Sequence, residues 1–255
     1  MKLNRSLFAA LGLVLVSMLV QPSSVAAGDI TVLCSNGIKT VMEDLLPKFE
    51  KATGHKVTIE YNLAAVLKQK IESGAGFDLA ILTPPLVDDL VKQGKMAADS
   101  RTMLARSGLG LLIRAGGHKK DVSTTEAFKR ALLEAKSIAY AKVGASGVYF
   151  AELVQKLGVA DAVKSKSRQT ATGEEVGESV ARGDVELGVL PLSEILPVKG
   201  AELLGMFPAD IQSYIVMTAG VNANSKQGQA ARDLIKFVTA PAALPVIKAK
   251  GMERG

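Results

Sequence analysis

Aromatic side chains and cysteines are scarce in this chain, and each scarcity excludes a class of site. Only 4% of the residues are aromatic and none is Trp, which argues against a stacking platform for single-stranded nucleic acid or a ring-lined sugar cleft. The single cysteine, Cys34, cannot form an internal disulfide or a Cys-based zinc cage. Two histidines, His55 and His118, leave little for a His-rich metal site. We therefore expect neither a metal nor another cofactor.

A strong excess of charge of one sign is also missing. Lys and Arg total 31 and Asp and Glu total 25, which gives a formal net charge of +6. No basic helix or stripe stands out along the chain, so we expect no nucleic-acid partner. Hydrophobic residues make up 48% of the 255 residues, which is enough for a packed core in one large domain or two small ones.

The N-terminus has the pattern of an export signal. A basic start containing Lys2 and Arg5 precedes an apolar run over residues 7–20 and a small-residue segment that ends at Ala27. These are the three parts of a secretory signal peptide. The apolar run is too short to span a bilayer comfortably. We therefore predict a cleaved signal peptide over residues 1–27 and a periplasmic mature protein.

After residue 27, short buried strands alternate with amphipathic helices. Strand patterns occur at 29–34, 57–61, 77–82, 109–113, 137–140, 185–190, 201–206 and 214–221. Helical spacing of apolar residues occurs at 38–53, 63–73, 86–93, 126–135, 150–157, 174–182, 231–238 and after 241. This alternation predicts an α/β fold with parallel sheets covered by helices. The basic stretch 164–168 is predicted to be a solvated loop, and His55 is predicted to face solvent.

Four loops lie where a parallel sheet binds ligands, beyond the carboxyl ends of the strands. They cover residues 35–37, 62–64, 83–84 and 145–147. A helix that begins in such a loop offers unpaired backbone N–H groups and a partial positive charge. Several of these helix ends together would hold an anion without a formal cation. For any one loop alone, the alternative is that its Ser or Asn only caps its own helix.

Several segments, taken in order, resemble a known family. Residues 70–79 are KIESGAGFDL, 146–149 are SGVY, 181–188 are ARGDVELG and 237–243 are FVTAPAA. In this order they resemble segments of periplasmic solute-binding proteins, most closely the molybdate-binding subfamily of ABC importers. The resemblance implies the type II periplasmic binding protein fold, with two α/β lobes, each a mostly parallel sheet flanked by helices, and two hinge crossovers. Residues 28–108 and 213–255 would form lobe 1, and residues 109–212 would form lobe 2.

The same resemblance implies the function of a binding protein. A small anion would bind between the lobes, and the closed protein, a monomer, would dock on an ABC permease. The candidate ligand-binding residues are Ser35, Asn36, Gly37, Asn62, Leu63, Ala64, Thr83, Arg106, Ser146, Gly147, Tyr149 and Ser193.

Three side chains that donate to the oxyanion in molybdate binders have no counterpart here. The aligned positions hold Gly37, Ala64 or Ala65, and Pro191. The family resemblance favours a molybdate-type oxyanion as the ligand. A dehydrated dianion needs many donors, so a small organic carboxylate stays open as the alternative. The guanidinium of Arg106 would suit a carboxylate. A secreted protein that supplies a sensor or receptor, instead of a transporter, is a further alternative.

A secreted hydrolase is the enzymatic alternative. The residues around Ser146 are GASG, which is no G-x-S-x-G nucleophile elbow. Cys34 ends a predicted buried strand, where a thiol is inert packing. We therefore predict no enzymatic activity.

Overall fold

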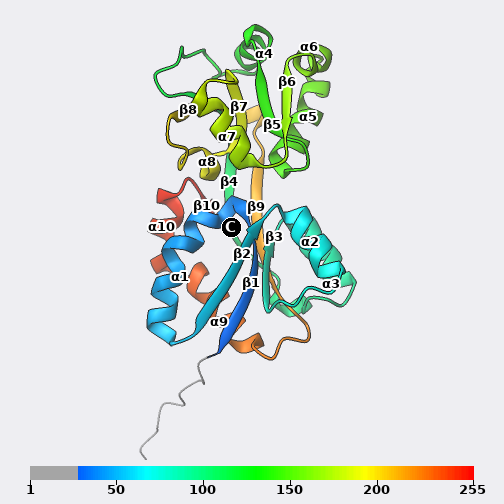
Figure 1. The fold of residues 1–255 in the computed structure, drawn as a ribbon, viewed down its shortest axis with the longest axis vertical. Coiled ribbons are helices and arrows are strands. Elements are labelled where there is room, and N and C mark those ends of the chain that lie inside the picture. Colours follow the sequence, from blue (N-terminus) through cyan, green and yellow to red (C-terminus); the bar gives the residue numbers. More distant parts are fainter. Residues whose placement is uncertain (1–27) are drawn as a thin grey trace, which may run out of the picture.

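The computed structural model describes residues 28–255, so the predicted signal peptide lies outside the described residues. Two lobes lie one above the other along the longest axis of the molecule, and strands β4 and β9 run between them (Figure 1). Each lobe is a sheet flanked by helices, as the fold prediction required. No helix within residues 28–255 is long and apolar enough to cross a membrane.

Lobe 1 begins with three parallel strands, each followed by a helix. The order is β1 (Asp29–Ser35), η1 (Asn36–Ile38), α1 (Lys39–Thr53), β2 (Lys56–Asn62), α2 (Ala64–Glu72), β3 (Leu79–Leu82) and α3 (Pro84–Lys92). β1 is the central strand and pairs in parallel with both β2 and β3. Parallel neighbours need a crossover connection, which is why helices separate these strands. Gly54 ends α1 in the left-handed conformation, with φ of 78°.

Lobe 2 repeats this arrangement with different strand partners. Its elements are α4 (Thr125–Glu134), β5 (Ile138–Ala141), α5 (Ala145–Lys156), α6 (Ala160–Lys164), β6 (Ser167–Thr170), α7 (Gly173–Arg182), β7 (Leu187–Pro191), α8 (Leu192–Ile195) and β8 (Ala201–Met206). β5 pairs in parallel with β6 and β7. The chain then passes η3 (Ala209–Ile211) and returns to lobe 1 with β9 (Tyr214–Val221), α9 (Gly228–Thr239), η4 (Pro241–Ala243), α10 (Leu244–Ala249) and β10 (Glu253–Arg254).

The strand β4 (Thr102–Arg114), which follows η2 (Ala98–Ser100), belongs to both lobes. Its first part pairs with β9 as far as Gly108, and from Leu109 onward it pairs with β7, while β8 lines its other edge. The predicted strand at 109–113 was therefore too short at its start. Gly108 lies inside this strand, and a Cβ there would lie 2.8 Å from the Met206 side chain, so glycine permits close packing. The change of partner falls between Gly108 and Leu109, and the lobe boundary at residue 108 stays our proposal.

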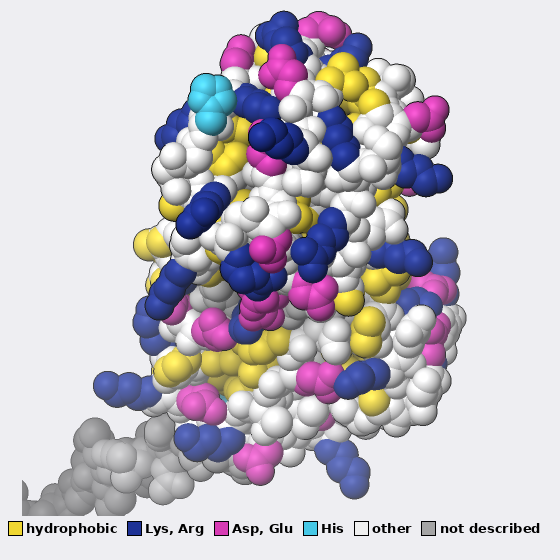
Figure 2. Space-filling view, turned by 45° about the horizontal axis from the view of Figure 1, so that its top comes forward, with side chains coloured by type: hydrophobic (Ala, Val, Ile, Leu, Met, Phe, Trp, Pro, Cys, Tyr) yellow, Lys and Arg dark blue, Asp and Glu magenta, His cyan; other side chains and the backbone are white. Residues whose placement is uncertain are grey.

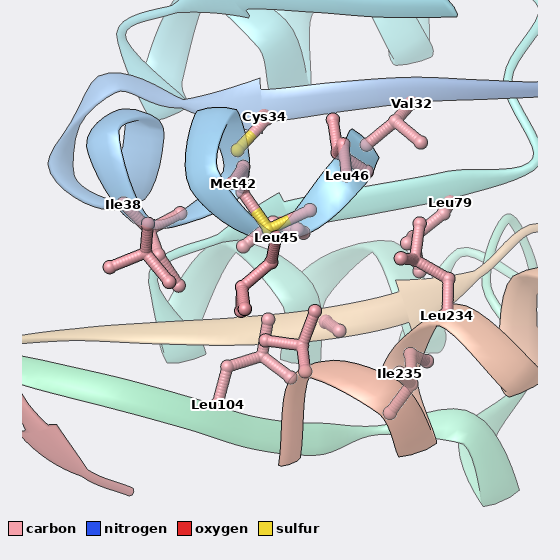
Figure 3. Close-up of a cluster of buried hydrophobic side chains, with 14 of the residues drawn as sticks. Val32, Cys34, Ile38, Met42, Leu45, Leu46, Leu79, Leu104, Leu234 and Ile235 are labelled. Carbon is pink, nitrogen blue, oxygen red and sulfur yellow. The ribbon is translucent and has the colours of Figure 1, made fainter. Parts of the chain in front are cut away.

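Each lobe has its own hydrophobic core. In lobe 1, side chains from β1, α1, β3, β4 and α9 meet in one cluster, among them Val32, Leu45, Leu104 and Leu234 (Figure 3). A separate cluster in lobe 2 is built around Phe128, Phe150 and their neighbours. Because the apolar contacts are concentrated within each lobe, the lobes are suited to moving as units about the connecting strands.

Two local predictions were wrong. The basic stretch 164–168 does not stay a loop, because from Ser167 it forms the edge strand β6, with Arg168 exposed. His55 is only 2% exposed. Its Nδ1 accepts the N–H of Gly28 at 3.0 Å, and its ring stacks on Phe49. The imidazole therefore holds the residue that precedes β1 and does not face solvent.

The amide of Gln212 joins the two crossings between the lobes. Its Oε1 accepts the N–H groups of Leu109 and Ser213 at 2.9 Å each. Its Nε2 donates to the carbonyls of Leu109 at 3.1 Å and Phe207 at 3.2 Å. One side chain thus satisfies backbone groups on β4 and on the segment that leads into β9.

We predict that Gln212→Ala lowers the free energy of unfolding by about 1–2 kcal/mol. The Ser213 N–H and the Phe207 carbonyl lose their partner, whereas the Leu109 N–H and carbonyl keep backbone hydrogen bonds to Ser213 and Phe207. Urea denaturation followed by circular dichroism measures the change. Gln69→Ala, on the exposed face of α2, is the matched control and should change stability by no more than about 0.5 kcal/mol. A Gln212→Ala protein as stable as the control would contradict this role.

Candidate functional site

A cleft of about 680 Å³ lies between the lobes. Its walls come from the carboxyl ends of β1, β3 and β5, from the starts of α2, α3 and α5, and from the lobe-crossing part of β9. The structure brings seven of the predicted site residues together in this cleft: Ser35, Asn36, Leu63, Ala64, Thr83, Ser146 and Tyr149. Of the three positions that the resemblance aligns with oxyanion donors, two also line this cleft, namely Ala64 or Ala65, and Pro191; Gly37 does not.

The first turns of α2 and α5 face each other across the cleft, one from each lobe. A Cβ built on Gly144, which precedes α5, would lie 4.0 Å from Cδ2 of Leu63, which precedes α2. Neither helix has a side-chain cap, and neither has an acidic residue in its first turn. Their leading backbone N–H groups and positive dipole ends are therefore free to attract an anion.

The start of α3, the third helix at the cleft, offers fewer backbone N–H donors than its position after β3 predicted. α3 begins with Pro84 and Pro85, and proline has no N–H to donate. The next two N–H groups, of Leu86 and Val87, both point to the carbonyl of Thr83. The loop at 83–84 therefore offers the Thr83 hydroxyl and a helix dipole, but no free backbone donor in this turn.

Several polar side chains in the cleft are available to a ligand. Within residues 28–255, no side-chain hydrogen bond is made by Ser35, Asn36, Thr83 or Ser146, although all four line the cleft. Ser35 and Ser146 are only 7% and 6% exposed as residues, and both line the cleft. Tyr149 differs, because its hydroxyl donates to the carbonyl of Ile211 at 2.8 Å.

The rest of the lining is apolar, and its only formal charges are negative. Side chains such as Leu86, Val143 and Met217 line the cleft. The charged residues of the lining are Glu152 and Glu194, with no Lys or Arg among the described residues that form it. Elsewhere, positive and negative side chains are interspersed over both lobes on the face that Figure 2 shows. Any attraction for an anion must therefore come from backbone dipoles and neutral donors.

Five predicted site residues lie elsewhere, and two of them join the lobes. Ser193 Oγ donates to the carbonyl of Gly37 at 2.9 Å, and the Ser193 N–H donates to Ser107 Oγ at 3.0 Å. Ser193 is 3% exposed, and its hydroxyl is already engaged by this contact. Ser193 and Gly37 therefore help to hold α8 of lobe 2 against the turn after β1 of lobe 1.

The other three are engaged in local structure. Asn62 Oδ1 accepts the N–H of Leu63 at 2.8 Å. Gly147 is buried within α5, on the side of the helix that faces β5. A Cβ there would lie 1.9 Å from the carbonyl oxygen of Ala141, so any side chain would disrupt the packing of α5 on β5. The Arg106 guanidinium binds Glu253 at 2.8 Å and lies over the ring of Tyr214, 4.4 Å from its centroid.

The sequence analysis missed Glu194 and a second cavity. This cavity, of about 500 Å³, lies between α1 of lobe 1 and α7 and α8 of lobe 2. Asn36, Gly173 and Glu194 border both cavities. Glu194 follows the carboxyl end of β7, so the rule that selected the other four loops would have selected it too.

Burial raises the pKa of Glu194 to about 7. A pKa above the unfolded value of 4.5 means that ionisation costs folding free energy. Below pH 4.5 the carboxyl is protonated in both states and this cost is absent. The cost grows as the pH rises from 4.5 to about 7, and it reaches its full size above the folded-state pKa.

We predict that Glu194→Gln raises the free energy of unfolding at pH 8 by roughly 2–3 kcal/mol, because the neutral amide has no charge to bury. Near pH 4.5 the substitution should have little effect. Urea denaturation at both pH values measures the difference, with Glu152→Gln on the exposed rim as control. An equal gain at both pH values would contradict the burial of an ionised carboxyl.

Comparisons with known proteins agree with this architecture. The chain is 30% identical over 230 residues to an aconitate isomerase from a Pseudomonas species, covering 88% of this chain and 87% of the relative. It is 29% identical over 230 residues to the molybdate-binding protein ModA of Azotobacter vinelandii, covering 88% and 90%. The resemblance to the molybdate-binding subfamily is thereby confirmed.

The fold has a solved counterpart as well. The periplasmic molybdate-binding protein of Azotobacter vinelandii superimposes with a TM-score of 0.75 at 20% identity, over 89% of this chain and 99% of that one. The predicted two-lobed periplasmic binding protein fold is therefore confirmed. A family model matches residues 30–253, and the chain belongs to the bacterial extracellular solute-binding protein family.

Proposed function

We propose that this protein captures a small organic anion with two or more carboxylates in the cleft between its lobes. The observation that carries the proposal is the facing pair of uncapped helix ends, α2 from lobe 1 and α5 from lobe 2. Each end can hold one anionic group of the ligand, so a ligand with a carboxylate at each end would bridge the lobes and favour closure.

The lining supports a carboxylate over a tetrahedral oxyanion. Gly37, Ala64 or Ala65, and Pro191 lack the hydroxyls that a compact dianion needs. The apolar wall formed by residues such as Leu86 and Met217 suits the carbon skeleton of an organic acid. The relative named aconitate isomerase points to the same ligand class, because aconitate is a tricarboxylate.

Family membership also suggests where the protein acts and what it delivers its ligand to. We propose that residues 1–27 are removed on export, that the mature protein acts in the periplasm as a monomer, and that the closed form delivers its ligand to an ABC permease. Membership of an extracellular solute-binding family supports this setting.

A ligand panel tests the proposal. Isothermal titration calorimetry of the mature protein should show micromolar or tighter binding of at least one di- or tricarboxylate among fumarate, succinate, citrate and trans-aconitate. Molybdate and sulfate should bind at least tenfold more weakly. The reverse order of affinities would show that backbone donors suffice for an oxyanion and would overturn the carboxylate assignment.

A charge substitution checks the location of the site. Ala145 is exposed at the first position of α5, and Ala145→Asp should weaken carboxylate binding at least tenfold by placing a negative charge at the anion-attracting helix end. Ala75→Asp, beyond the far end of α2, is the matched control and should bind like the parent protein. Equal affinities for the two variants would remove α5 from the site.

Isomerisation of an unsaturated polycarboxylate is the second candidate function. The aconitate isomerase relative and the buried Glu194 carboxyl at the cleft favour it. Glu194 would take a proton from a methylene next to a carboxylate, the double bond would shift, and Glu194 would return the proton to the former vinyl carbon. Proton NMR of cis- and trans-aconitate with the protein measures turnover, which Glu194→Gln should abolish. Binding without turnover would leave capture as the function.

A further inference from the structure

Glu194 holds a position between the lobes that no other acidic residue of the two cavity linings shares. It borders both the cleft and the second cavity. A Cβ built on Gly173, in the first turn of α7, would lie 2.2 Å from Glu194 Oε2. A Cβ on Gly37, after β1, would lie 3.7 Å from Oε1. The carboxyl therefore fills the space between the two lobes beside a helix N-terminus.

This carboxyl has no partner within residues 28–255, and burial is the only influence on its pKa. The charged groups around the second cavity are Lys39 and Glu43 of α1, Glu174, Glu178 and Arg182 of α7, and Lys199. On the cleft side, the titratable groups are Tyr149, Glu152 and Tyr214.

The nearby cations have other partners or make no ion pair with Glu194. Arg182 binds Asp184 and Glu178, and Lys39 lies over the ring of Tyr61. The N-terminus of α7 is also less able to stabilise a negative charge on Glu194 than the N-termini of α2 and α5 would be. Thr172 caps it, and Glu174 and Glu175 already occupy its first turn.

An ionised Glu194 would repel an anion that enters the cleft, whereas the neutral acid would offer it an O–H donor. We propose that Glu194 is a specificity-determining residue that binds the ligand as the neutral acid and donates a hydrogen bond to one of the ligand's carboxylates. Each binding event then takes up a proton. This inference rests on the proposed capture of a carboxylate.

The energetic cost of supplying that proton is small near neutral pH, because burial raises the pKa of Glu194 to about 7. A bound anion favours the protonated form and raises this pKa further. Affinity is therefore highest below the pKa of the free protein and falls above it, by up to tenfold for each pH unit.

Calorimetric titration of the mature protein with fumarate at pH 6 and pH 8, and with trans-aconitate at pH 8, tests the inference. Fumarate stays fully ionised over this range, so a pH dependence of its affinity reports the titration of the protein. The third carboxyl of trans-aconitate still titrates within the range, so this ligand is compared at pH 8 only. The dissociation constant of the parent protein should rise about tenfold between the two pH values. Titration at pH 8 in buffers of different ionisation enthalpy should show uptake of close to one proton per ligand. A purely structural role for Glu194 would not produce that uptake.

Glu194→Gln keeps the shape of the side chain and carries a permanent donor. It should bind with an affinity that does not change between pH 6 and pH 8, and without proton uptake. Glu152→Gln removes the other negative charge of the cleft lining and should keep both the pH dependence and the uptake. Circular dichroism melting confirms that both variants are folded.

The outcomes separate this inference from the proposed function. Carboxylate binding that is independent of pH in the parent protein would overturn the role of Glu194 and leave capture intact. A pH dependence that survives in Glu194→Gln, or disappears in Glu152→Gln, would overturn it as well. No carboxylate binding at either pH would overturn the proposed function itself.

Discussion

The antiparallel pairing along β4 and β9 is the constraint on which the rest of the molecule depends. β4 changes its partner from β9 to β7 between Gly108 and Leu109, so one continuous backbone takes part in both sheets. The lobes are held together at this line, and the carboxyl ends of β1 and β3 in one lobe and of β5 and β7 in the other meet at the same gap. The site exists because this hinge places two sets of loops face to face.

Backbone dipoles take the place of cations in this site. The starts of α2 and α5 are left without caps or acidic neighbours, whereas α7 is capped by Thr172 and carries Glu174 and Glu175 in its first turn. The start of α3 is closed by two prolines. The uncapped helix ends at the cleft are therefore few, and they lie on opposite lobes. In the proposed function, a ligand that bridges them would favour closure of the lobes.

The chain keeps the architecture of its relatives while changing the chemistry of the lining. The family resemblance aligns Gly37, Ala64 or Ala65, and Pro191 with donors of the molybdate binders, and the proposed carboxylate ligand is based on that difference. Ser35, Thr83 and Ser146 remain as neutral donors in the cleft. Glu194 adds an acid whose charge depends on pH near neutrality, because partial burial raises its pKa to about 7. One fold can thus serve different anions through a few side chains at loop positions.

The sequence by itself determined the alternation of strands and helices, because buried β-branched runs and helical spacing of apolar residues are local patterns. It also pointed to the loops after β1, β2, β3 and β5, since strand ends precede them directly. Only the tertiary structure decided that Gly147, Arg106 and Ser193 are engaged in packing, an ion pair and a contact between the lobes. The burial of His55 and the partial burial of Glu194 were likewise decided by other segments of the chain, such as Gly28 and Gly173. Periodicity cannot encode such pairings, because they arise only when separate elements pack together.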